Sequence, residues 1–418
     1  MRLVGDERVV AGPYRVAHLA ARCVGLVTTL AADLLRERGT EPGEVSVDLR
    51  HAAEAFRSER HLLVDGAPVG DLWAPLSGDY RAADGWLRLH CNYPHHEAAV
   101  RSVLGDDVTA AVAARQASEV VEAVLAAGGA AAQLRSPAAW ADHPQGRAVA
   151  TEPLVAVERI GDGPPRPLPP ADRPLTGVRV LDLTHVIAGP VCGRTLAAHG
   201  ADVLHVGAEH LPVMRPALVD TSFGKRTTWL DLRDPENATR LRELWADADV
   251  LVQSYRPDSL SLRGFGPDDA PQGTILVSLS AYGHTGPWRA RRGFDSLLQL
   301  ATGIAHRGDS KPVPLPAQAL DHGTGWLAAS GALTALRRRA TEGGTWHVKV
   351  SLARTAHLLD SLGWIDSVED DSPVDAYLSE VDAPIGRVRH VLPPGGLPAA
   401  PPRWDHGPRV PGSDPATW

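Results

Sequence analysis

Lysine is scarce in this sequence, and basic charge is not in excess. The 418 residues include 42 basic side chains, yet lysine occurs only as Lys225, Lys311 and Lys349, and the formal net charge is −8. Such a chain lacks the basic footprint of a nucleic-acid-binding protein, so we expect no nucleic acid among its partners. The rarity of lysine also draws attention to Lys225, which lies inside one of the motifs described below.

Cysteine and long uncharged apolar runs are scarce as well. The three cysteines, at positions 23, 91 and 192, are far apart and odd in number, which fits a reducing compartment better than a disulfide framework. No uncharged apolar run reaches 18 residues, and the N-terminal sequence lacks the pattern of a signal peptide. We therefore expect a cytoplasmic protein without a membrane span.

Metal-ligand spacing is absent too. Paired histidines such as His95 and His96 lack HExxH or Cys/His spacing, so surface or helix-capping roles are favoured over a metal site.

A compact βαβ pattern stands out over residues 174–206. The β-branched run from Val178 to Leu183 predicts a buried parallel strand, followed by a turn, a short helix that ends at Gly200, and a second strand over 202–206. In open α/β folds, ligands bind beside the turn that follows such a strand. The pattern predicts a ligand crevice without naming the ligand, because neither GxGxxG nor a Walker loop is present.

Two distant segments look like copies of one unit. Residues 15–49 and 325–352 each predict an Ala/Leu-rich helix, a turn and a strand, and such internal repetition bears on the choice of fold. Asp321 lies four residues before the second segment, whereas the matching position before Gly25 is Ala21. If the segments are copies, only the second carries an acidic residue there, and we expect one active site.

Six short motifs follow one another from residue 175 onward. They are Leu-Thr-Gly-Val-Arg-Val-Leu-Asp-Leu-Thr-His-Val-Ile-Ala-Gly-Pro (175–190), Phe-Gly-Lys-Arg-Thr-Thr-Trp-Leu-Asp-Leu (223–232), Ser-Tyr-Arg-Pro (254–257), Ser-Ala-Tyr-Gly-His-Thr-Gly-Pro (280–287), Gly-Phe-Asp (293–295) and Leu-Asp-His-Gly-Thr-Gly (320–325). Each is short, but in this order they resemble the class III (CaiB/BaiF-type) CoA-transferases.

The resemblance implies an α/β protein with a Rossmann-like, parallel-sheet CoA-binding domain and a smaller α+β domain. Here the smaller domain would come first, so the domain order looks permuted or partly duplicated. Members of the family form interlocked dimers, which implies a homodimer. The expected parts are a duplicated helix-turn-strand unit (1–60), the smaller domain (61–160), a Pro-rich linker (161–174), the CoA-binding domain with the catalytic aspartate (175–365) and a Pro/Gly-rich tail (366–418).

Asp321 is the expected catalytic residue. By pattern alone, a carboxylate at the start of a predicted helix is more readily interpreted as its cap. The resemblance implies instead a nucleophile that attacks an acyl-CoA thioester and forms a mixed anhydride, with water kept out. We expect the helix N-terminus to lower the pKa of Asp321 and keep it ionised at neutral pH.

Further residues would bind coenzyme A by the same resemblance. The turn over 185–188 would contact it mainly through backbone groups, and two cations on the next motif would meet its phosphates. An aromatic ring and an arginine would cover the adenine and a phosphate. These residues are His185, Val186, Ile187, Ala188, Lys225, Arg226, Tyr255, Arg256 and Phe294. From the residues alone, a strand-end role for His185 and a solvated turn for Lys225 and Arg226 stay open.

Three positions depart from the family's motifs. Ser254 stands where Asn is usual, Asp258 where Gly is usual, and Gly207 where an acidic residue usually ends the second strand. The resemblance further implies that coenzyme A is a substrate, as acyl-CoA, and not a permanently bound cofactor. The other substrate would be a small carboxylic acid, and no metal is expected.

Three functions fit these features. The first is a CoA-transferase that moves coenzyme A from an acyl-CoA to a carboxylic acid. The second is an enzyme similar to the 2-methylacyl-CoA racemases, with Asp321 as a base. Those racemases carry a histidine where this chain has Phe294, so the second base of such a mechanism is missing. The third is a non-catalytic CoA-binding protein, suggested by the unusual domain order. We prefer the transferase, and nothing in the sequence identifies the acids.

Overall fold

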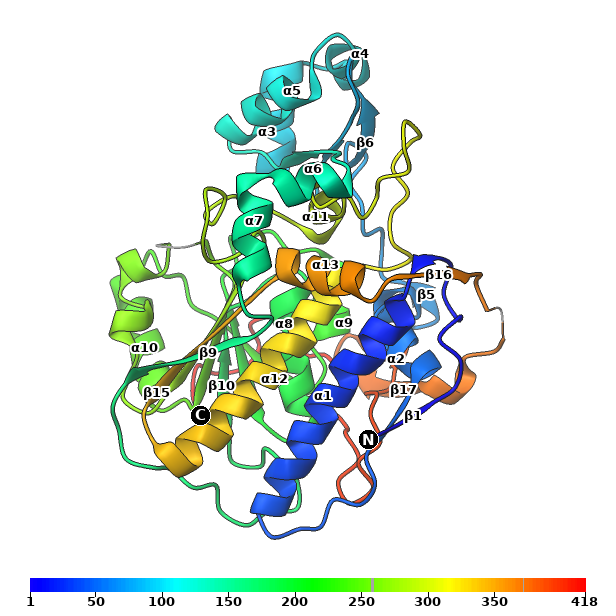
Figure 1. Ribbon diagram of the computed structural model, residues 1–418. Helices are drawn as coiled ribbons and strands as arrows, with labels where there is room; N and C mark the ends of the chain where they lie inside the picture. The colour runs from blue at the N-terminus through cyan, green and yellow to red at the C-terminus, as the bar shows by residue number, and fades with distance from the viewer. Residues whose placement is uncertain (257–258, 371) are drawn as a thin grey trace.

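A large mixed sheet organises the mixed α/β fold of the computed structural model, which describes residues 1–256, 259–370 and 372–418 (Figure 1). In spatial order its strands are β12 (Lys225–Trp229), β11 (Asp202–Gly207), β10 (Arg179–Asp182), β13 (Val250–Gln253), β14 (Ile275–Ser280), β15 (Thr345–Ser351) and β9 (Ala156–Gly161). Neighbours pair in parallel except β15 and β9. The chain runs outward from β10 in one direction and then from β13 in the other, so the turn after β10 lies where the strand order reverses, a place where such sheets bind ligands.

Helices cover both faces of this sheet, which is why its central strands are continuous apolar runs. On one face, α8 (Ala188–Ala198) and α12 (Ala319–Glu342) share a core with the inward side chains of β10, β13 and β14. On the other face, α10 (Pro235–Ala246) packs through Leu241, Leu244 and Trp245. Asp234 caps α10 by accepting the backbone N–H of Glu236.

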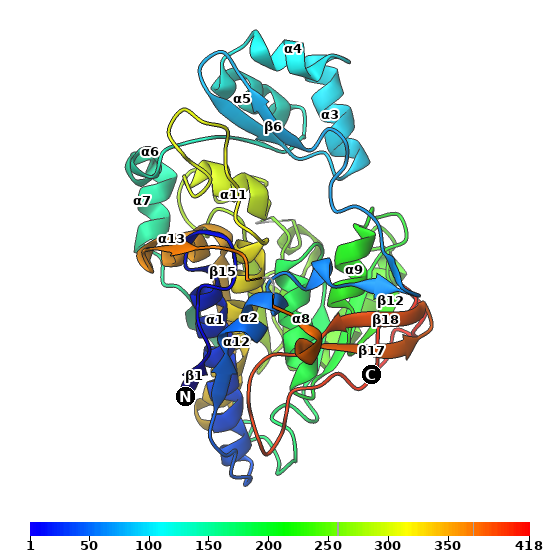
Figure 2. The same cartoon turned by 90° about the vertical axis from the view of Figure 1, so that its right-hand side faces the viewer.

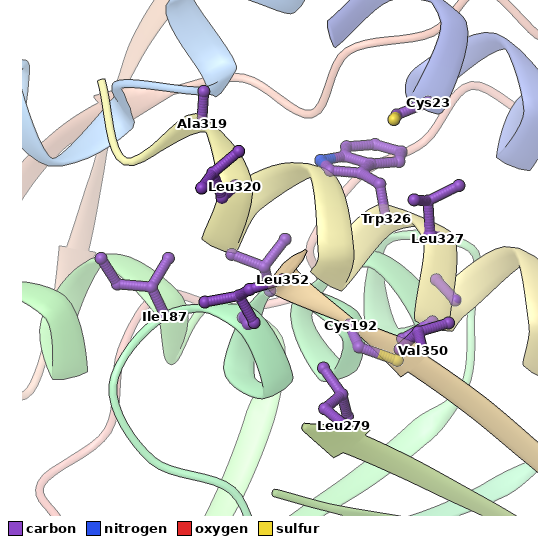
Figure 3. Packing of buried hydrophobic residues seen from close by; sticks show 14 of the residues in the cluster. Cys23, Ile187, Cys192, Leu279, Ala319, Leu320, Trp326, Leu327, Val350 and Leu352 are labelled. Carbon is purple, nitrogen blue, oxygen red and sulfur yellow. The ribbon is translucent and has the colours of Figure 1, made fainter. Parts of the chain in front are cut away.

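The helix α12 lies between α8 and α1 (Val16–Glu37) (Figure 1). Gly325 permits the close approach to α8, since a Cβ there would lie 2.4 Å from the carbonyl oxygen of Ala188 and 2.8 Å from Cβ of Val191. Figure 3 shows part of the resulting core, with Trp326 and Leu327 from α12, Cys192 from α8 and Cys23 from α1. The segment that begins α12 is therefore fixed from two sides.

By length and composition alone, α1 would suffice to cross a membrane, and it is the one such helix in the part of the chain that the structure describes. Arg22 and Asp33 interrupt the apolar sequence of α1, so the helix contains no uncharged apolar run of 18 residues. Of its most apolar 18 residues, 67% are buried inside the protein. Its apolar character is accounted for by the core that it shares with α12.

The two segments that resemble each other in sequence both fold as helix, strand and helix. The first is α1, β3 (Ser46–Asp48) and α2 (Leu49–Ala55), and the second is α12, β15 and α13 (Leu352–Ser361). They differ in their surroundings, because β3 pairs with β1 (Arg2–Val4) and not with the large sheet. Ala21, the counterpart of Asp321, is fully buried in α1.

A separate core forms at one end of the molecule, as Figures 1 and 2 show. Its antiparallel strands are β6 (Gly78–Arg81), β7 (Trp86–Leu89) and β8 (Ala131–Gln133), and its helices are α3 (Pro94–Leu104), α4 (Val108–Ala113) and α5 (Ala117–Ala126). Gly105 is the C-cap of α3. The chain returns to β9 through α6 (Pro137–Asp142) and α7 (Pro144–Thr151), and residues 162–174 contain no helix or strand.

The C-terminal segment is more regular than its proline and glycine content suggests. It contains β16 (Trp364–Ser367), paired with β2 (Gly12–Tyr14), and the hairpin of β17 (Leu378–Ala383) and β18 (Gly386–Val391). The hairpin continues through β4 (Leu63–Val64) to β5 (Ala67–Pro68). Strands from the first 70 residues therefore order this segment, and the sequence of the segment alone does not reveal these partners.

The contact between α8 and α12 gives a test of stability. Gly325→Ala should lower the free energy of unfolding by about 1–3 kcal/mol, because the new methyl group meets a backbone carbonyl that cannot easily move. Urea unfolding measures the change. Gly85→Ala is the matched control, since a Cβ at Gly85 has no neighbour within 4 Å. Equal stability of the two variants would contradict the close approach.

Candidate active site

A cavity of about 480 Å³ lies where the turn after β10, the loops after β13 and β14, and the start of α12 meet. Its volume is in the range of small-molecule sites. The beginning of α3 forms another part of its wall, so both halves of the chain contribute. The residues used below that line it are Tyr93, His95, His96, His185, Val186, Ala188, Leu211, Tyr255, Arg256, Arg289, Arg291, Arg292, Phe294 and Asp321.

Asp321 is the third residue of α12 and is 7% exposed. It does not cap its helix. Asp295, the first residue of α11 (Asp295–Ala301), accepts the backbone N–H groups of Leu320 and Asp321 at 2.8 and 2.9 Å. Asp295 thereby satisfies two of the N–H groups that every helix N-terminus leaves free, and the side chain of Asp321 is left facing the cavity. The simple interpretation of Asp321 as a helix cap is wrong.

The charges around Asp321 also correct the expected pKa. Burial raises the pKa of Asp321 well above its ordinary value, and the negative charges of Asp295 and Glu59 raise it further. Burial likewise raises the pKa of Asp295 to about 6, although hydrogen bonds from Gln299 and from the backbone of Asp321 and Leu320 act in the opposite direction. The free N–H groups that would have stabilised an ionised Asp321 are used by a second carboxylate, so the predicted lowering of its pKa is wrong.

The turn after β10 has a strained backbone. Val186 has φ of 72°, a conformation that is unfavourable for a β-branched residue by about 1–3 kcal/mol. Thr184, two residues before Val186, donates hydrogen bonds from its backbone N–H and its hydroxyl to the carboxylate of Asp182. Lys225 donates to Asp182 at 2.8 Å and to the carbonyl of Pro190 at 2.7 Å. The turn is thus fixed on both sides of Val186.

Lys225 and Arg226 do not line the cavity. Lys225 is 2% exposed, and its ammonium group is held in the buried ion pair with Asp182. Arg226 pairs with Asp202 at 2.8 Å and lies over the ring of Trp418. Lys225 instead lines a separate small cavity of about 30 Å³, together with His185 and Val186. Their expected contact with phosphates has no counterpart in this geometry.

The other expected ligand contacts lie at the cavity or next to it. His185, Val186, Ala188, Tyr255, Arg256 and Phe294 line it together with Asp321. The Nε2 atom of His185 is 3.2 Å from the Tyr255 hydroxyl, and burial lowers the pKa of His185 to about 4. Ile187 instead lines a small adjoining cavity, which Asp321 also borders. Pro257 and Asp258, the end of the Ser-Tyr-Arg-Pro motif and the departure that follows it, lie outside the described residues.

A second cavity of about 180 Å³ adjoins the first beyond the ends of β11 and β12. Leu211 and Tyr255 border both cavities. Gly207, the departure at the end of the second strand, lies in the wall of the second cavity together with Ser259.

Sequence reasoning missed the part of the site that comes from the first half of the chain. Burial raises the pKa of Tyr93 to about 12, and the charge of Asp321 adds to the shift. His96 was expected at the surface or at a cap, but it is 1% exposed and neither ring nitrogen has a hydrogen-bond partner. The Tyr-Pro-His-His sequence at the start of α3 was the one available signal. Its meaning depends on contacts with residues two hundred positions away.

No group of three or more His, Cys, Asp or Glu residues that could hold a metal ion is found among residues 1–256, 259–370 and 372–418.

Comparison with known proteins identifies the family. Residues 175–372 match the model of CoA-transferase family III. The matched region, residues 175–372, is a CoA-transferase family III region, and the members of that family are transferase enzymes. It is 28% identical to an acyl-CoA transferase of Gibberella moniliformis over 432 residues, which cover 90% of this chain and 74% of that protein.

The other similarities are shorter. The beta subunit of the succinyl-CoA–L-malate CoA-transferase of Chloroflexus aurantiacus is 35% identical over 201 residues, or 43% of this chain and 49% of that one. A crystal structure of Rv3272 from M. tuberculosis is 29% identical, with a TM-score of 0.43 over 46% of this chain and 58% of that one. This chain therefore spans about half the length of these two relatives, and the family assignment depends on the sequence matches.

The raised pKa of Asp321 predicts how stability varies with pH. A carboxyl group whose pKa is higher in the folded than in the unfolded protein favours folding only while it stays protonated. Its contribution is complete below the unfolded pKa of about 3.9 and is lost as the pH rises through the folded pKa. Asp321→Asn should therefore be more stable than the unchanged protein at pH 8, with the difference disappearing near pH 4. Urea unfolding at both pH values measures this.

The exposed Asp71 provides the control. Asp71→Asn should leave the free energy of unfolding unchanged within about 0.5 kcal/mol at both pH values. A loss of stability in Asp321→Asn at pH 8 would contradict the charge environment described for Asp321.

Proposed function

We propose that the chain is a CoA-transferase that moves coenzyme A from an acyl-CoA thioester to a carboxylic acid through a covalent intermediate on Asp321. The observation that carries the proposal is the buried carboxylate of Asp321 on the wall of the large cavity. Asp295 binds the N-terminus of the helix in its place, and the chain matches the model of this family. The Chloroflexus relative is a succinyl-CoA–L-malate CoA-transferase subunit, and this supports a carboxylic acid as the acceptor.

The steps follow from carboxylate chemistry. A carboxylate oxygen of Asp321 attacks the thioester carbonyl carbon, the C–S bond breaks, and the CoA thiolate leaves a mixed anhydride on the enzyme. The thiolate then attacks the aspartyl carbonyl, which releases the first acid and gives an aspartyl thioester. The second acid attacks this thioester, and the thiolate finally attacks the new acyl carbon. Each step exchanges one acyl bond for another and regenerates Asp321 at the end.

The raised pKa of Asp321 bears on this chemistry in two ways. An ionised carboxylate of higher pKa is a stronger base and nucleophile, but a smaller fraction is ionised at a given pH. Transfer should accordingly become faster as the pH rises through that pKa. The apolar neighbours Val186, Phe294 and Leu211 exclude water from the cavity wall, which the anhydride requires.

Coenzyme A would lie along the two adjoining cavities. We assign its nucleotide end to the smaller cavity beyond β11 and β12, and its thioester to the larger one, with Tyr255 and Leu211 at the junction. Under this proposal, the region from residue 175 to 365 is a Rossmann-like CoA-binding domain, and the strand order that reverses at β10 supports it. A homodimer and a cytoplasmic location complete the proposal.

The first test removes the proposed nucleophile. Asp321→Ala should lower transfer of CoA from radiolabelled acyl-CoAs to a panel of carboxylic acids by about 10³-fold or more, while CoA binding measured by calorimetry persists. Asp71→Ala serves as the exposed control. Equal transfer by Asp321→Ala and the unchanged protein would refute the covalent role.

The alternatives have their own outcomes in the same experiment. Tight CoA binding by both proteins without any transfer would favour a non-catalytic CoA-binding protein. Solvent deuterium entering the α-carbon of a 2-methylacyl-CoA would favour a racemase. The Phe294 ring, at the position of the missing histidine, stacks on His90 with centroids 3.7 Å apart, and it offers no proton acceptor there.

The assignment of the nucleotide end gives a second test. Ser259→Trp should fill much of the smaller cavity and raise KM for acyl-CoA about tenfold, which corresponds to ~1.4 kcal/mol. The KM for the acid should stay unchanged because the change is confined to the smaller cavity. The exposed Ser361 supplies the control, Ser361→Trp. If Ser259→Trp alters only the KM for the acid, the placement of coenzyme A is reversed.

A further inference from the structure

The large cavity is strongly unbalanced in charge. Of the residues that line it in the described part of the chain, Asp321 is the single carboxylate, while Arg256, Arg289, Arg291 and Arg292 supply four guanidinium groups. Arginine is suited to bind carboxylates and phosphates through two parallel hydrogen bonds. The cavity is therefore built for a ligand with more than one anionic group.

The four arginines differ in their surroundings. Arg256 and Arg289 are exposed, whereas Arg291 and Arg292 are partly buried. Arg291 is already paired, since it binds Glu122 at 2.9 Å and lies over the Trp288 ring at 4.0 Å. This leaves Arg292 as the inner cation of the wall without an ion pair among the described residues.

Arg292 is held in place by the backbone. Its Nη1 atom donates to the carbonyl oxygens of Gly128 and Gly129, the latter at 3.0 Å. Burial lowers the pKa of Arg292, and the charge of Arg256 lowers it further. A partly buried cation beside another cation is electrostatically unfavourable until an anion arrives.

His96 supplies a second unsatisfied group at the same cavity. Burial lowers its pKa to about 3, and the charges of His95, Arg292 and His90 act in the same direction. The imidazole is therefore neutral, with one N–H donor and one acceptor, and neither nitrogen has a partner. A buried donor left without a partner costs about 1–3 kcal/mol, which a ligand oxygen would remove.

His96, Arg292 and Asp321 line the same cavity. The His96 ring packs edge-on against Phe294 and Tyr93, with centroids 5.7 and 5.5 Å away. Phe294 directly precedes Asp295, whose carboxylate binds the backbone of Asp321. Phe294 thus links the wall that carries His96 to the carboxylate that fixes the first turn of α12.

We propose that His96 and Arg292 bind the distal carboxylate of a dicarboxylic acid or its acyl group, while the other carboxyl carbon reacts at Asp321. This deepens the proposed function and rests on it. Arg292 supplies the charge and His96 a neutral N–H. A monocarboxylic acid of the same length would leave Arg292 without a counter-charge and His96 without a hydrogen-bond partner, and this mismatch is the physical source of selectivity.

The test compares acids of equal chain length. With the acyl-CoA donor that gives the fastest turnover, kcat/KM should be at least tenfold higher for succinate and glutarate than for butyrate and valerate. Arg292→Gln should lower kcat/KM for the diacids at least tenfold and for the monoacids less than twofold. Arg292→Lys, which keeps the charge, should retain part of the preference, and His96→Phe should lose part of it.

Controls separate this role from folding. Arg101→Gln, on the exposed side of the helix that carries His96, should leave both classes of acid unaffected. Thermal unfolding followed by circular dichroism checks that each variant is folded. Equal use of diacids and monoacids by the unchanged protein would overturn the proposal, as would an equal loss for both in Arg292→Gln.

A phosphate of coenzyme A has the same recognition chemistry, so the donor must be varied too. With acyl-pantetheine thioesters, which lack all phosphates, the loss of diacid preference in Arg292→Gln should persist. If it disappears, the anion at Arg292 is a phosphate and the proposal is overturned. If the unchanged protein transfers CoA to no acid, the proposed function fails, and calorimetric binding of glutarate against valerate still decides the subsite.

Discussion

The hydrogen bonds from the start of α12 to Asp295 are the interaction on which the site depends. They fix the first turn of the helix that carries Asp321, and they use the N–H groups that would otherwise have stabilised a charge on Asp321 itself. The Asp295 carboxylate thus fixes the geometry of the helix, and the Asp321 carboxylate remains available at the cavity. The cost is a close pair of buried acids whose pKa values are both raised.

The same separation of roles is found on the other side of the cavity. Lys225 and Asp182 form a buried ion pair that touches no cavity wall near Asp321 but anchors the turn in which Val186 adopts its strained backbone. Replacing one member of such a pair leaves an uncompensated buried charge. Lys225, which the family resemblance marks for phosphate binding, therefore supports the shape of the turn that lines the cavity.

Much of the fold could be predicted because its signals are local. The βαβ unit that contains β10, α8 and β11 and the two similar helix-turn-strand segments follow from short stretches of adjacent residues. The family motif singled out Asp321, which does line the cavity. The expected lowering of its pKa was wrong. A pKa depends on residues such as Glu59 that are distant in sequence, and α12 begins six residues before the predicted helix because its first turn is stabilised from outside.

The contribution of the first half of the chain to the cavity could not be predicted from the sequence, because it too depends on contacts between residues that are distant in sequence. His96 lies in a sequence typical of a surface helix start, and its burial is caused by Phe294 and the arginine-rich loop before it. These contacts create a gradient of charge across one cavity, from the buried Asp321 at α12 to the partly buried arginines of the loop before Phe294. A ligand with an electrophilic carbon at one end and an anion at the other has only one favourable orientation in that gradient. In the proposed reaction, electrostatics would thus orient the substrate before the covalent step begins.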